Sequence, residues 1–294
     1  MNRTVRIGSR DSTLALRQTE LVRQAIQADN PDISTELVLI KTTGDLVLDT
    51  SLDEIGGKGL FIKELEAALL DNSIDIAVHS YKDMPVETSD DLQIVALSPR
   101  EQPFDALVLP VGADQISPEP AVGSSSQRRA IQFADLYPEC TTASIRGNVL
   151  TRLRKLDEGQ YSALILAQAG LLRLGLEHRI HQVFTADQMI PAASQGIMAV
   201  QGRAGEDYGY LAAYDDQTSR IASEAERQFL ITLGGDCSAP IAAYAQVSGS
   251  QLLLRAMYVD KQGRMAKGQL AGATEQAAAL GEQLANQLLR SLEA

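Results

Sequence analysis

The first half of the chain alternates short β-branched runs with amphipathic stretches, and this alternation limits the fold more than any other feature of the sequence. Asp11 or Ser12 is expected to cap the first amphipathic helix, which should end before Pro31. Elements in this order favour β-α-β units on a mainly parallel sheet. The strands predicted for this first set are residues 5–8, 36–40 and 74–79.

Residues 100–105, with Pro99 and Pro103, are interpreted as a crossing between domains, because proline breaks a helix and fixes an extended path. A second set of alternating elements follows this crossing. Around Pro191 to Gly196 the chain is expected to turn back, so that residues 197–200 return as a strand to the first domain. Two such crossings imply a hinge. The predicted strands of the second set are residues 121–123, 141–145 and 161–167, and its predicted helices are 125–137, 148–157 and 169–174.

The remainder of the chain predicts a small α+β domain. A helix that begins at Thr218 should end at Gly234, and strands are expected at 242–247 and 252–258, before an Ala-, Leu- and Gln-rich last helix. At roughly 100–200 residues per domain, a chain of 294 residues allows two or three domains. The expected domains are residues 1–98 with 195–214, residues 101–190 and residues 217–294.

The charge balance and the apolar pattern exclude several classes of protein. With 26 Lys and Arg against 38 Asp and Glu, the formal net charge of −12 repels a phosphate backbone and argues against nonspecific nucleic-acid binding. Charged residues occur from the start, and no run of 18 apolar residues follows, so we expect a cytoplasmic protein that is not membrane-bound. Cys140 and Cys237 are too few for a disulfide scaffold and are expected to be reduced.

Common catalytic and metal-binding patterns are missing from the sequence. There is no G-x-S-x-G elbow, no phosphate-binding loop ending in Gly-Lys-Ser/Thr, no G-x-G-x-x-G after a strand and no H-E-x-x-H. His178 and His181 have no second pair of ligands nearby, so a solvated helix face is favoured over a metal site. His79 closes an apolar strand and is interpreted as a hydrogen-bonded core residue. No metal is predicted.

Arginine residues gather where predicted strands pass into helices. In an open α/β sheet these junctions lie at the edge where ligands bind, and helix N-termini add free N–H groups there. Guanidinium groups match carboxylates and phosphates, so the pattern indicates a polyanionic ligand. For any one arginine, solvation of an amphipathic helix is an equal alternative. The residues at these junctions are Arg10, Ser12, Ser124, Ser125, Ser126, Arg128, Arg129, Arg146, Arg152 and Arg173.

Two further segments carry reactive groups. Lys82 and Asp83 follow a strand and precede Pro85, where an ionised carboxylate can stabilise a cation on a substrate or exchange a proton. A turn held by an Asx hydrogen bond is the alternative. Cys237 follows a helix that ends in two glycines, and a thiol on such a loop is open to covalent attachment. A small buried residue at a domain contact is the alternative for Cys237.

Several long motifs, spread over nearly the whole chain, closely resemble those of the porphobilinogen deaminase (hydroxymethylbilane synthase) family. The turn with Lys82 and Asp83, the arginine junctions and the Cys237 loop occur in the family's order and spacing. The matching motifs are RIGSRDSTLAL (6–16), GGKGLF (56–61), AVHSYKDMP (77–85), SSQRR (125–129), IRGNV (145–149), TRL (151–153), AGLLRLG (169–175) and the loop around Cys237.

The resemblance implies two α/β domains of the type II periplasmic-binding-protein kind, joined by a hinge, and a small C-terminal α+β domain. It also implies a transferase of tetrapyrrole, porphyrin and heme biosynthesis, which joins four porphobilinogen molecules stepwise into hydroxymethylbilane and releases ammonia. The expected partners are the small-molecule substrate porphobilinogen and the next enzyme of the pathway, which receives the product. A monomer without a nucleic-acid or membrane partner is expected.

The resemblance also assigns roles to single residues. Cys237 would hold a dipyrromethane cofactor through a thioether, and Asp83 and Lys82 would be catalytic. The other residues implied in binding the cofactor are Ser126, Arg128 and Arg129, together with Lys82 and Asp83. The residues implied in binding the acetate and propionate groups of the substrate are Arg10, Ser12, Arg146, Arg152, Arg173 and Gln195.

A few positions depart from the family's common pattern. Ser124 stands where threonine is common, Gln127 where leucine is common, and Ser194 where glycine is common. Asp236 puts a carboxylate directly before Cys237, where glycine or cysteine is common, and removes no reacting group. The main alternative is a non-catalytic solute-binding protein of the same hinge fold, which predicts no need for Cys237 and no third domain.

Overall fold

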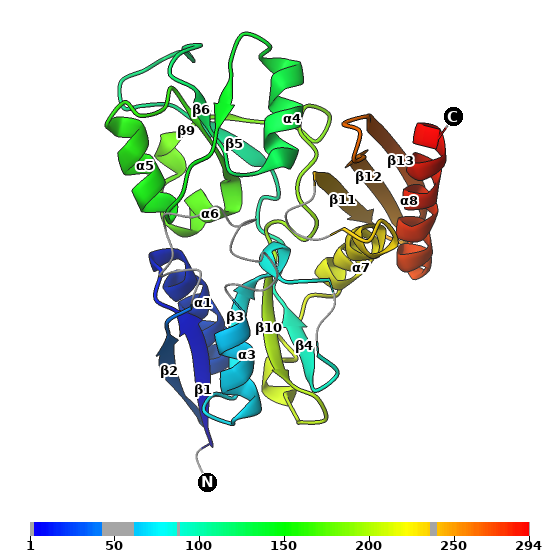
Figure 1. Ribbon diagram of the computed structural model, residues 1–294. Coiled ribbons are helices and arrows are strands. Elements are labelled where there is room, and N and C mark those ends of the chain that lie inside the picture. Colours follow the sequence, from blue (N-terminus) through cyan, green and yellow to red (C-terminus); the bar gives the residue numbers. More distant parts are fainter. Residues whose placement is uncertain (1–2, 43–61, 87–88, 236–239, 294) are drawn as a thin grey trace. The chain divides into compact units, whose positions relative to one another are not determined.

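The computed structural model describes residues 3–42, 62–86, 89–235 and 240–293. The chain forms two compact units, of which the first comprises residues 1–101 and 197–220 and the second residues 102–196 and 221–294. The strands of the described residues form two five-stranded sheets and one three-stranded sheet (Figure 1). The first unit holds one of the five-stranded sheets, and the second unit holds the other two sheets.

The sheet of the first unit has the strand order β2-β1-β3-β10-β4. Ser12, one of the two expected caps, accepts a hydrogen bond from the N–H of Ala15 and begins α1. The predicted return of residues 197–200 to this sheet is confirmed, because β10 lies between β3 and β4. The elements of the unit are β1 (Arg3–Arg10), α1 (Thr13–Asp29), β2 (Ile33–Ile40), α3 (Lys63–Leu70), β3 (Ile76–Ser80), η1 (Tyr81–Asp83), β4 (Leu92–Leu97), β10 (Met198–Arg203) and η3 (Gly209–Leu211).

Helices cover both faces of this sheet. Successive side chains of a strand point to opposite faces, so Ile76 of β3 packs with Val22 of α1, whereas the next residue, Ala77, packs with Leu65 of α3. Because both faces are covered, the strand β3 is buried along nearly its whole length and holds the turn that follows it in a fixed place.

The α/β part of the second unit has the strand order β7-β6-β8-β5-β9. Phe133 of α4 packs with Val122 and Ile165 on one face, and Leu156 of α5 packs with Leu164 on the other. The elements are β5 (Asp105–Val108), β6 (Val122–Gly123), α4 (Gln127–Leu136), β7 (Thr142–Ala143), α5 (Val149–Asp157), β8 (Leu164–Ala167), α6 (Gln168–Arg173), η2 (Glu177–Arg179) and β9 (Ile180–Val183).

The two five-stranded sheets have the same arrangement of strand directions. In the first sheet, β10 is antiparallel to both of its neighbours, while the remaining strands share one direction. In the second sheet, β5 is antiparallel to both of its neighbours, and the expected parallel order holds for β6, β7 and β8. The prediction of mainly parallel sheets is therefore right for strand direction, with one reversed strand in each.

The third sheet is an antiparallel meander of β11 (Ile241–Ser248), β12 (Gln251–Val259) and β13 (Met265–Ala273). The helices α7 (Gln217–Thr232) and α8 (Ala277–Glu293), with η4 (Thr274–Gln276), cover one face of this sheet (Figure 1). On that face Phe229 packs with Leu284. On the opposite face Tyr244 packs with Phe104 and Ile131. The second and third sheets thereby form one compact unit.

Several strands were not expected from the sequence, namely β4, β5, β9 and β13. The last of these lacks β-branched residues and contains Gly268 and Gly272. A Cβ at Gly268 would lie 2.9 Å from Leu288, and one at Gly272 would lie 2.8 Å from Leu280. Close packing of α8 therefore favours glycine at positions where the usual strand signal would place a large side chain.

The longest described helices, α1 and α8, have 17 residues each. In the described parts of the chain, no helix combines the length and the apolar character that crossing a bilayer requires.

Candidate active site

In the first unit, the residues singled out in the sequence lie where β1 and β3 end. These strands are parallel neighbours, so their carboxyl ends meet at one edge of the sheet. Arg10 is the last residue of β1, and Ser12 follows it. Lys82 and Asp83 follow β3. The fold therefore brings two segments that are far apart in sequence to the same edge of one sheet.

The turn that carries Asp83 is held by its neighbours. β3 ends at Ser80, whose hydroxyl accepts a hydrogen bond of 2.9 Å from Nε2 of the buried Gln18. Tyr81 and Met84 are buried on either side of the exposed Asp83, and the N–H of Met84 donates to the carbonyl of Tyr81 at 3.2 Å. The carboxylate of Asp83 accepts no hydrogen bond from a described residue, so the Asx bond considered for this turn is not formed among them.

His79 lies one residue before the end of β3 and is buried, in agreement with the core position expected for it. Burial lowers the pKa of His79 to about 4, and the nearby charge of Arg10 acts in the same direction, while the side chain of Gln201 opposes them. At neutral pH the imidazole is therefore uncharged and leaves Arg10 as a cation at this edge.

In the second unit, β6, β7 and β8 are parallel neighbours, and their carboxyl ends also meet at one edge. Residues 124–126 follow β6, Arg146 follows β7, and α6 with Arg173 follows β8. The hydroxyl of Ser125 accepts a hydrogen bond of 3.1 Å from the N–H of Ile145 and donates to its carbonyl, which joins the first two of these loops. The predicted position at strand-to-helix junctions is thus confirmed for Arg128, Arg129 and Arg146. Arg152 lies inside α5, and Arg173 is the last residue of α6 rather than its first.

The loop between β7 and α5 depends on a glycine. Gly147 has φ of 110°, a conformation that L side chains rarely adopt, and a Cβ there would lie 2.6 Å from Cγ2 of Thr151. Asn148 caps α5 by accepting a hydrogen bond of 2.9 Å from the N–H of Thr151. The carbonyl of Gly147 accepts a hydrogen bond of 2.8 Å from Nε of Arg152. This loop therefore fixes the backbone between Arg146 and Arg152.

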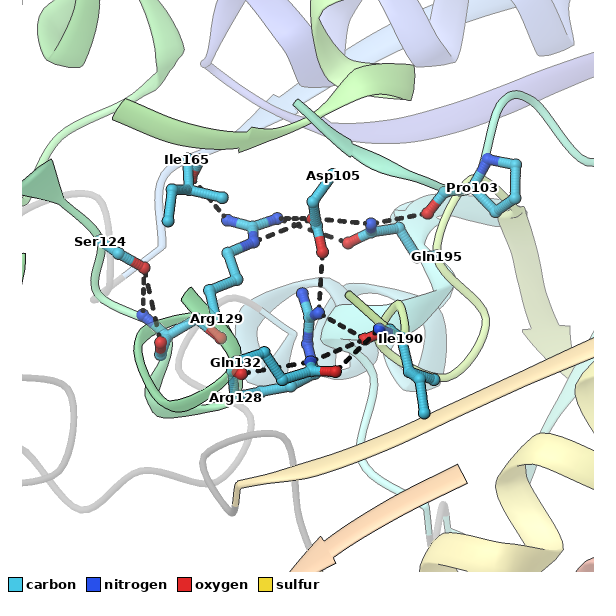
Figure 2. Close-up of polar contacts among 10 residues, drawn as sticks. Pro103, Asp105, Ser124, Arg128, Arg129, Gln132, Ile165, Ile190 and Gln195 are labelled. Carbon is cyan, nitrogen blue, oxygen red and sulfur yellow. Dashed lines mark hydrogen bonds and ion pairs between the residues drawn. The ribbon is translucent and has the colours of Figure 1, made fainter. Parts of the chain in front are cut away.

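Arg128 and Arg129 open α4 and converge on the carboxylate of Asp105 (Figure 2). Their exposed fractions are only 4% and 7%, and that of Asp105 is 0%. Nη1 of Arg128 lies 2.7 Å from Oδ2 of Asp105, and Nε of Arg129 lies 2.9 Å from Oδ1. A role in solvating the helix surface is therefore excluded for these two arginines.

The turn that contains Gln195 joins this cluster. Nε2 of the buried Gln195 donates to Oδ1 of Asp105 at 2.9 Å and to the carbonyl of Pro103 at 2.7 Å (Figure 2). Next to it, Ser194 has φ of 60°, in the left-handed region that favours glycine. Nη2 of Arg173 donates to the carbonyl of Gly196 at 2.6 Å. Hydrogen bonds to Asp105, to Pro103 and from Arg173 thus fix this turn.

Glu226 of α7 connects the same turn to the third sheet. Its buried carboxylate accepts hydrogen bonds of 2.6 Å from the N–H of Ser194 and from the N–H of Ala245 in β11. The helix that carries Glu226 ends at Thr232, two residues before Gly234, which has φ of 61°, and β11 begins at Ile241.

The loop between α7 and β11 contains Cys237, which lies outside the described residues together with its neighbour Asp236. The GGKGLF motif (56–61) also lies outside them. The other cysteine, Cys140, is a buried thiol with no disulfide, and burial raises its pKa, so it carries no thiolate at neutral pH.

Sequence reasoning missed Asp105, Gln132 and Glu226. Asp105 falls in the segment interpreted as a crossing, and its signal was a carboxylate directly before an apolar run. Gln132 lies one turn after Arg128 on α4 and accepts a hydrogen bond of 2.8 Å from the N–H of Ile190 (Figure 2). Glu226 carried no local signal, because its partners come from distant parts of the chain.

Comparison with known proteins gives matches along nearly the entire chain. Residues 5–209 match the family model described as porphobilinogen deaminase, dipyromethane cofactor binding domain, and residues 221–290 match the porphobilinogen deaminase C-terminal domain. A porphobilinogen deaminase of Acetivibrio thermocellus is 52% identical over 99% of both chains. One of Roseiflexus sp. is 45% identical over 98% of this chain and 97% of its own. Among solved structures, the periplasmic VFT2 domain of Bordetella pertussis BvgS is similar at a TM-score of 0.40 and 15% identity, covering 72% of this chain and 85% of that one.

Proposed function

This chain belongs to the porphobilinogen deaminase family, and from that premise we propose which of its residues bind and join the substrate molecules. It is a transferase of tetrapyrrole biosynthesis, which condenses four porphobilinogen molecules into hydroxymethylbilane with release of ammonia. The larger matched region is the dipyrromethane cofactor-binding domain. When bound, the dipyrromethane supplies the primer to which the first substrate molecule is joined.

The arginine pair at the start of α4 is the observation that supports the proposed site best. Two guanidinium groups share the one carboxylate of Asp105, which leaves a net charge of about +1 in a buried cluster. Nε and Nη2 of Arg128 donate to no described residue. Ser126, at the N-cap of α4, makes no side-chain capping bond, so the positive end of the helix dipole adds to this charge. These donors fit the carboxylate groups that dipyrromethane and porphobilinogen carry.

We assign Arg128, Arg129 and Ser126 to the cofactor, with Lys82 and Asp83. The substrate's acetate and propionate groups would be bound by six residues that contribute cationic groups, hydroxyl or amide. They are Arg10, Ser12, Arg146, Arg152, Arg173 and Gln195. In the structure the hydroxyl of Ser12 also caps α1, so Ser12 would act partly by fixing the start of that helix. Gln195 is fully buried, so it would act partly by holding the carboxylate of Asp105 in place.

Asp83 is proposed as the catalytic carboxylate. Loss of ammonia from porphobilinogen leaves positive charge on the substrate's methylene carbon and pyrrole ring, and an ionised carboxylate nearby lowers the energy of that charge. The exposed position of Asp83 on a turn fixed by buried neighbours suits this role, because little reorganisation is needed when the charge develops. The half-buried Lys82 beside it would deliver a proton to the leaving amine.

Cys237 is proposed to attach the cofactor through a thioether. Its sulfur would act once as the nucleophile and afterwards as an anchor. The domains proposed for this work are residues 1–98 with 195–214, residues 101–190 and residues 217–294. The last of these would carry the attachment loop.

Intact-protein mass spectrometry tests the proposal directly. The purified protein should carry a covalent two-ring adduct, and Cys237→Ser should lose both the adduct and hydroxymethylbilane synthesis. Cys140→Ala is the matched control, because it removes the other thiol from a buried site, and it should keep the adduct. An unmodified mass for the active parent protein, or an adduct retained by Cys237→Ser, would contradict the assignment.

We also propose that the protein acts as a monomer in the cytoplasm and passes its product to the enzyme that follows. Hydroxymethylbilane is a linear molecule with a reactive hydroxymethyl end, so direct transfer would protect it from uncatalysed ring closure. Size-exclusion chromatography with light scattering would test the monomer, and a coupled assay with the following enzyme would test the transfer.

A further inference from the structure

Asp105 reaches the ligand-binding edge of the second sheet because β5 runs against its neighbours. The first residue of β5, Asp105, therefore pairs with the last residue of β8, Ala167. The carboxyl ends of β6, β7 and β8 point to that same edge, where α4 begins. A reversed strand thus places an acidic side chain among groups that would otherwise be only cationic.

Both oxygens of the Asp105 carboxylate are occupied. Oδ2 accepts from Nη1 of Arg128 at 2.7 Å, while Oδ1 accepts from Nε of Arg129 at 2.9 Å and from Nε2 of Gln195 at 2.9 Å. Nη2 of Arg129 lies 2.8 Å from the same Oδ1. Burial alone would raise the pKa of Asp105, but the charges of Arg128 and Arg129 outweigh that effect and hold it well below its usual value.

Backbone carbonyls complete the support of each guanidinium group (Figure 2). Nη1 of Arg128 also donates to the carbonyl of Ile190 at 2.8 Å, and Nη1 of Arg129 donates to that of Ile165 at 3.1 Å. The two arginines differ in how many of their nitrogens have a hydrogen-bond partner. Every nitrogen of Arg129 is engaged, whereas Nε and Nη2 of Arg128 have no partner among the described residues.

We propose that Asp105 is a positioning residue for the reaction: it fixes the two arginines so that Arg128 presents Nε and Nη2 to a ligand carboxylate, while Arg129 supplies mainly charge. This inference rests on the proposed function, which assigns the pair to the cofactor. A guanidinium held in advance loses less conformational freedom on binding, and it keeps one position through successive condensations.

The test compares Asp105→Asn with Asp105→Glu in the full-length holoenzyme. The amide keeps the size but loses the charge and turns an N–H donor toward one arginine, whereas glutamate keeps the charge on a longer arm. Asp157→Asn is the matched control, because Asp157 forms a 2.7 Å ion pair with Arg179 at the surface of the same unit. The readouts are the occupancy of the two-ring adduct by intact mass, kcat and KM for porphobilinogen per folded molecule, and thermal unfolding.

For Asp105→Asn we expect a loss of about a hundredfold in kcat/KM, the order produced by a displacement of 1 Å in a binding group. Asp105→Glu should recover part of that loss, and Asp157→Asn should stay within about twofold of the parent protein. Arg128→Lys should lower adduct occupancy more than Arg129→Lys, a comparison that holds even where Asp105→Asn does not fold.

Two results separate the inference from the function on which it rests. If the parent protein carries no adduct, the proposed function fails whatever the variants do. If the parent protein carries the adduct and the folded Asp105 variants turn over like Asp157→Asn, or if both lysine variants lose the same occupancy, the positioning role alone is overturned.

Discussion

Replacing Gly147 with alanine should damage the protein in two separable ways. The backbone at this position has φ of 110°, which an L side chain adopts only with strain. The added Cβ would also lie 2.6 Å from Cγ2 and 2.8 Å from Cβ of Thr151, well inside ordinary contact. Relief requires the loop to move, and with it the carbonyl that accepts the hydrogen bond from Arg152.

The chain offers a control that isolates the backbone part. Gly159, at the other end of α5, has φ of 76°, and a Cβ added there would have no neighbour within 4 Å. We expect Gly159→Ala to cost about 1–2 kcal/mol of unfolding free energy from the backbone alone. Gly147→Ala should cost about 2–5 kcal/mol, because roughly 1–3 kcal/mol of overpacking is added to a backbone strain of similar order. Thr151→Ser, which removes Cγ2, should recover about 1 kcal/mol in the double variant.

Urea unfolding followed by circular dichroism measures these differences, and steady-state kinetics measure the effect on activity. Because the loop lies between Arg146 and Arg152, Gly147→Ala should lower kcat/KM at least tenfold, about 1.4 kcal/mol, while Gly159→Ala should leave it nearly unchanged. Equal losses of stability in the two glycine variants, with no recovery from Thr151→Ser, would refute the steric argument.

Three further predictions concern charge. Asp83→Asn should keep the adduct and lower turnover by about 10²–10⁴-fold, whereas Asp11→Asn, an exposed carboxylate at the same sheet edge, should not; near-normal turnover of Asp83→Asn would remove it from the mechanism. His79 has a folded pKa of about 4 against 6.5 when unfolded, so the unfolded state binds the proton first and stability falls as pH drops from 6.5 towards 4. The loss attributable to this group is about 2 kcal/mol at pH 5, and urea titrations of His79→Gln should show a flatter pH dependence. Gln195→Glu should cancel the net positive charge of the arginine pair and raise KM for porphobilinogen about tenfold. An unchanged KM would contradict a role of that charge in substrate binding.

The sequence was sufficient to predict helix ends and the positions of several arginines where local signals agreed with the fold. Ser12 as a cap and Asn148 at the start of α5 are local choices that the structure has at those places, and the predicted helix end at Gly234 falls two residues after the last residue of α7, Thr232. The arginines could be assigned to strand-to-helix junctions because parallel strands bring their carboxyl ends together.

What local signals did not supply were the partners of those arginines. Asp105 lies 23 residues before Arg128 on a strand of four residues, and its direction is decided only by pairing with β8. Glu226 accepts hydrogen bonds from the backbone N–H groups of Ser194 and Ala245. Because nearly every residue type has a backbone N–H, the side chains at these two positions do not indicate the contact. Contacts of this kind depend on tertiary packing, and a single sequence does not record them.

The reversed strand of the first sheet has a consequence for how the protein is made. In the described part of the chain β4 pairs with β10, and β10 is not synthesised until residues 198–203 leave the ribosome. Until then one edge of β3 has no partner strand, and β4, which among the described strands pairs only with β10, cannot join the sheet. We expect nascent chains shorter than about 200 residues to remain dependent on chaperones or on the translation machinery for solubility. A single cut of the gene at either crossing would likewise yield an N-terminal fragment that lacks the interior strand β10 and a C-terminal fragment in which β10 has neither of its partners.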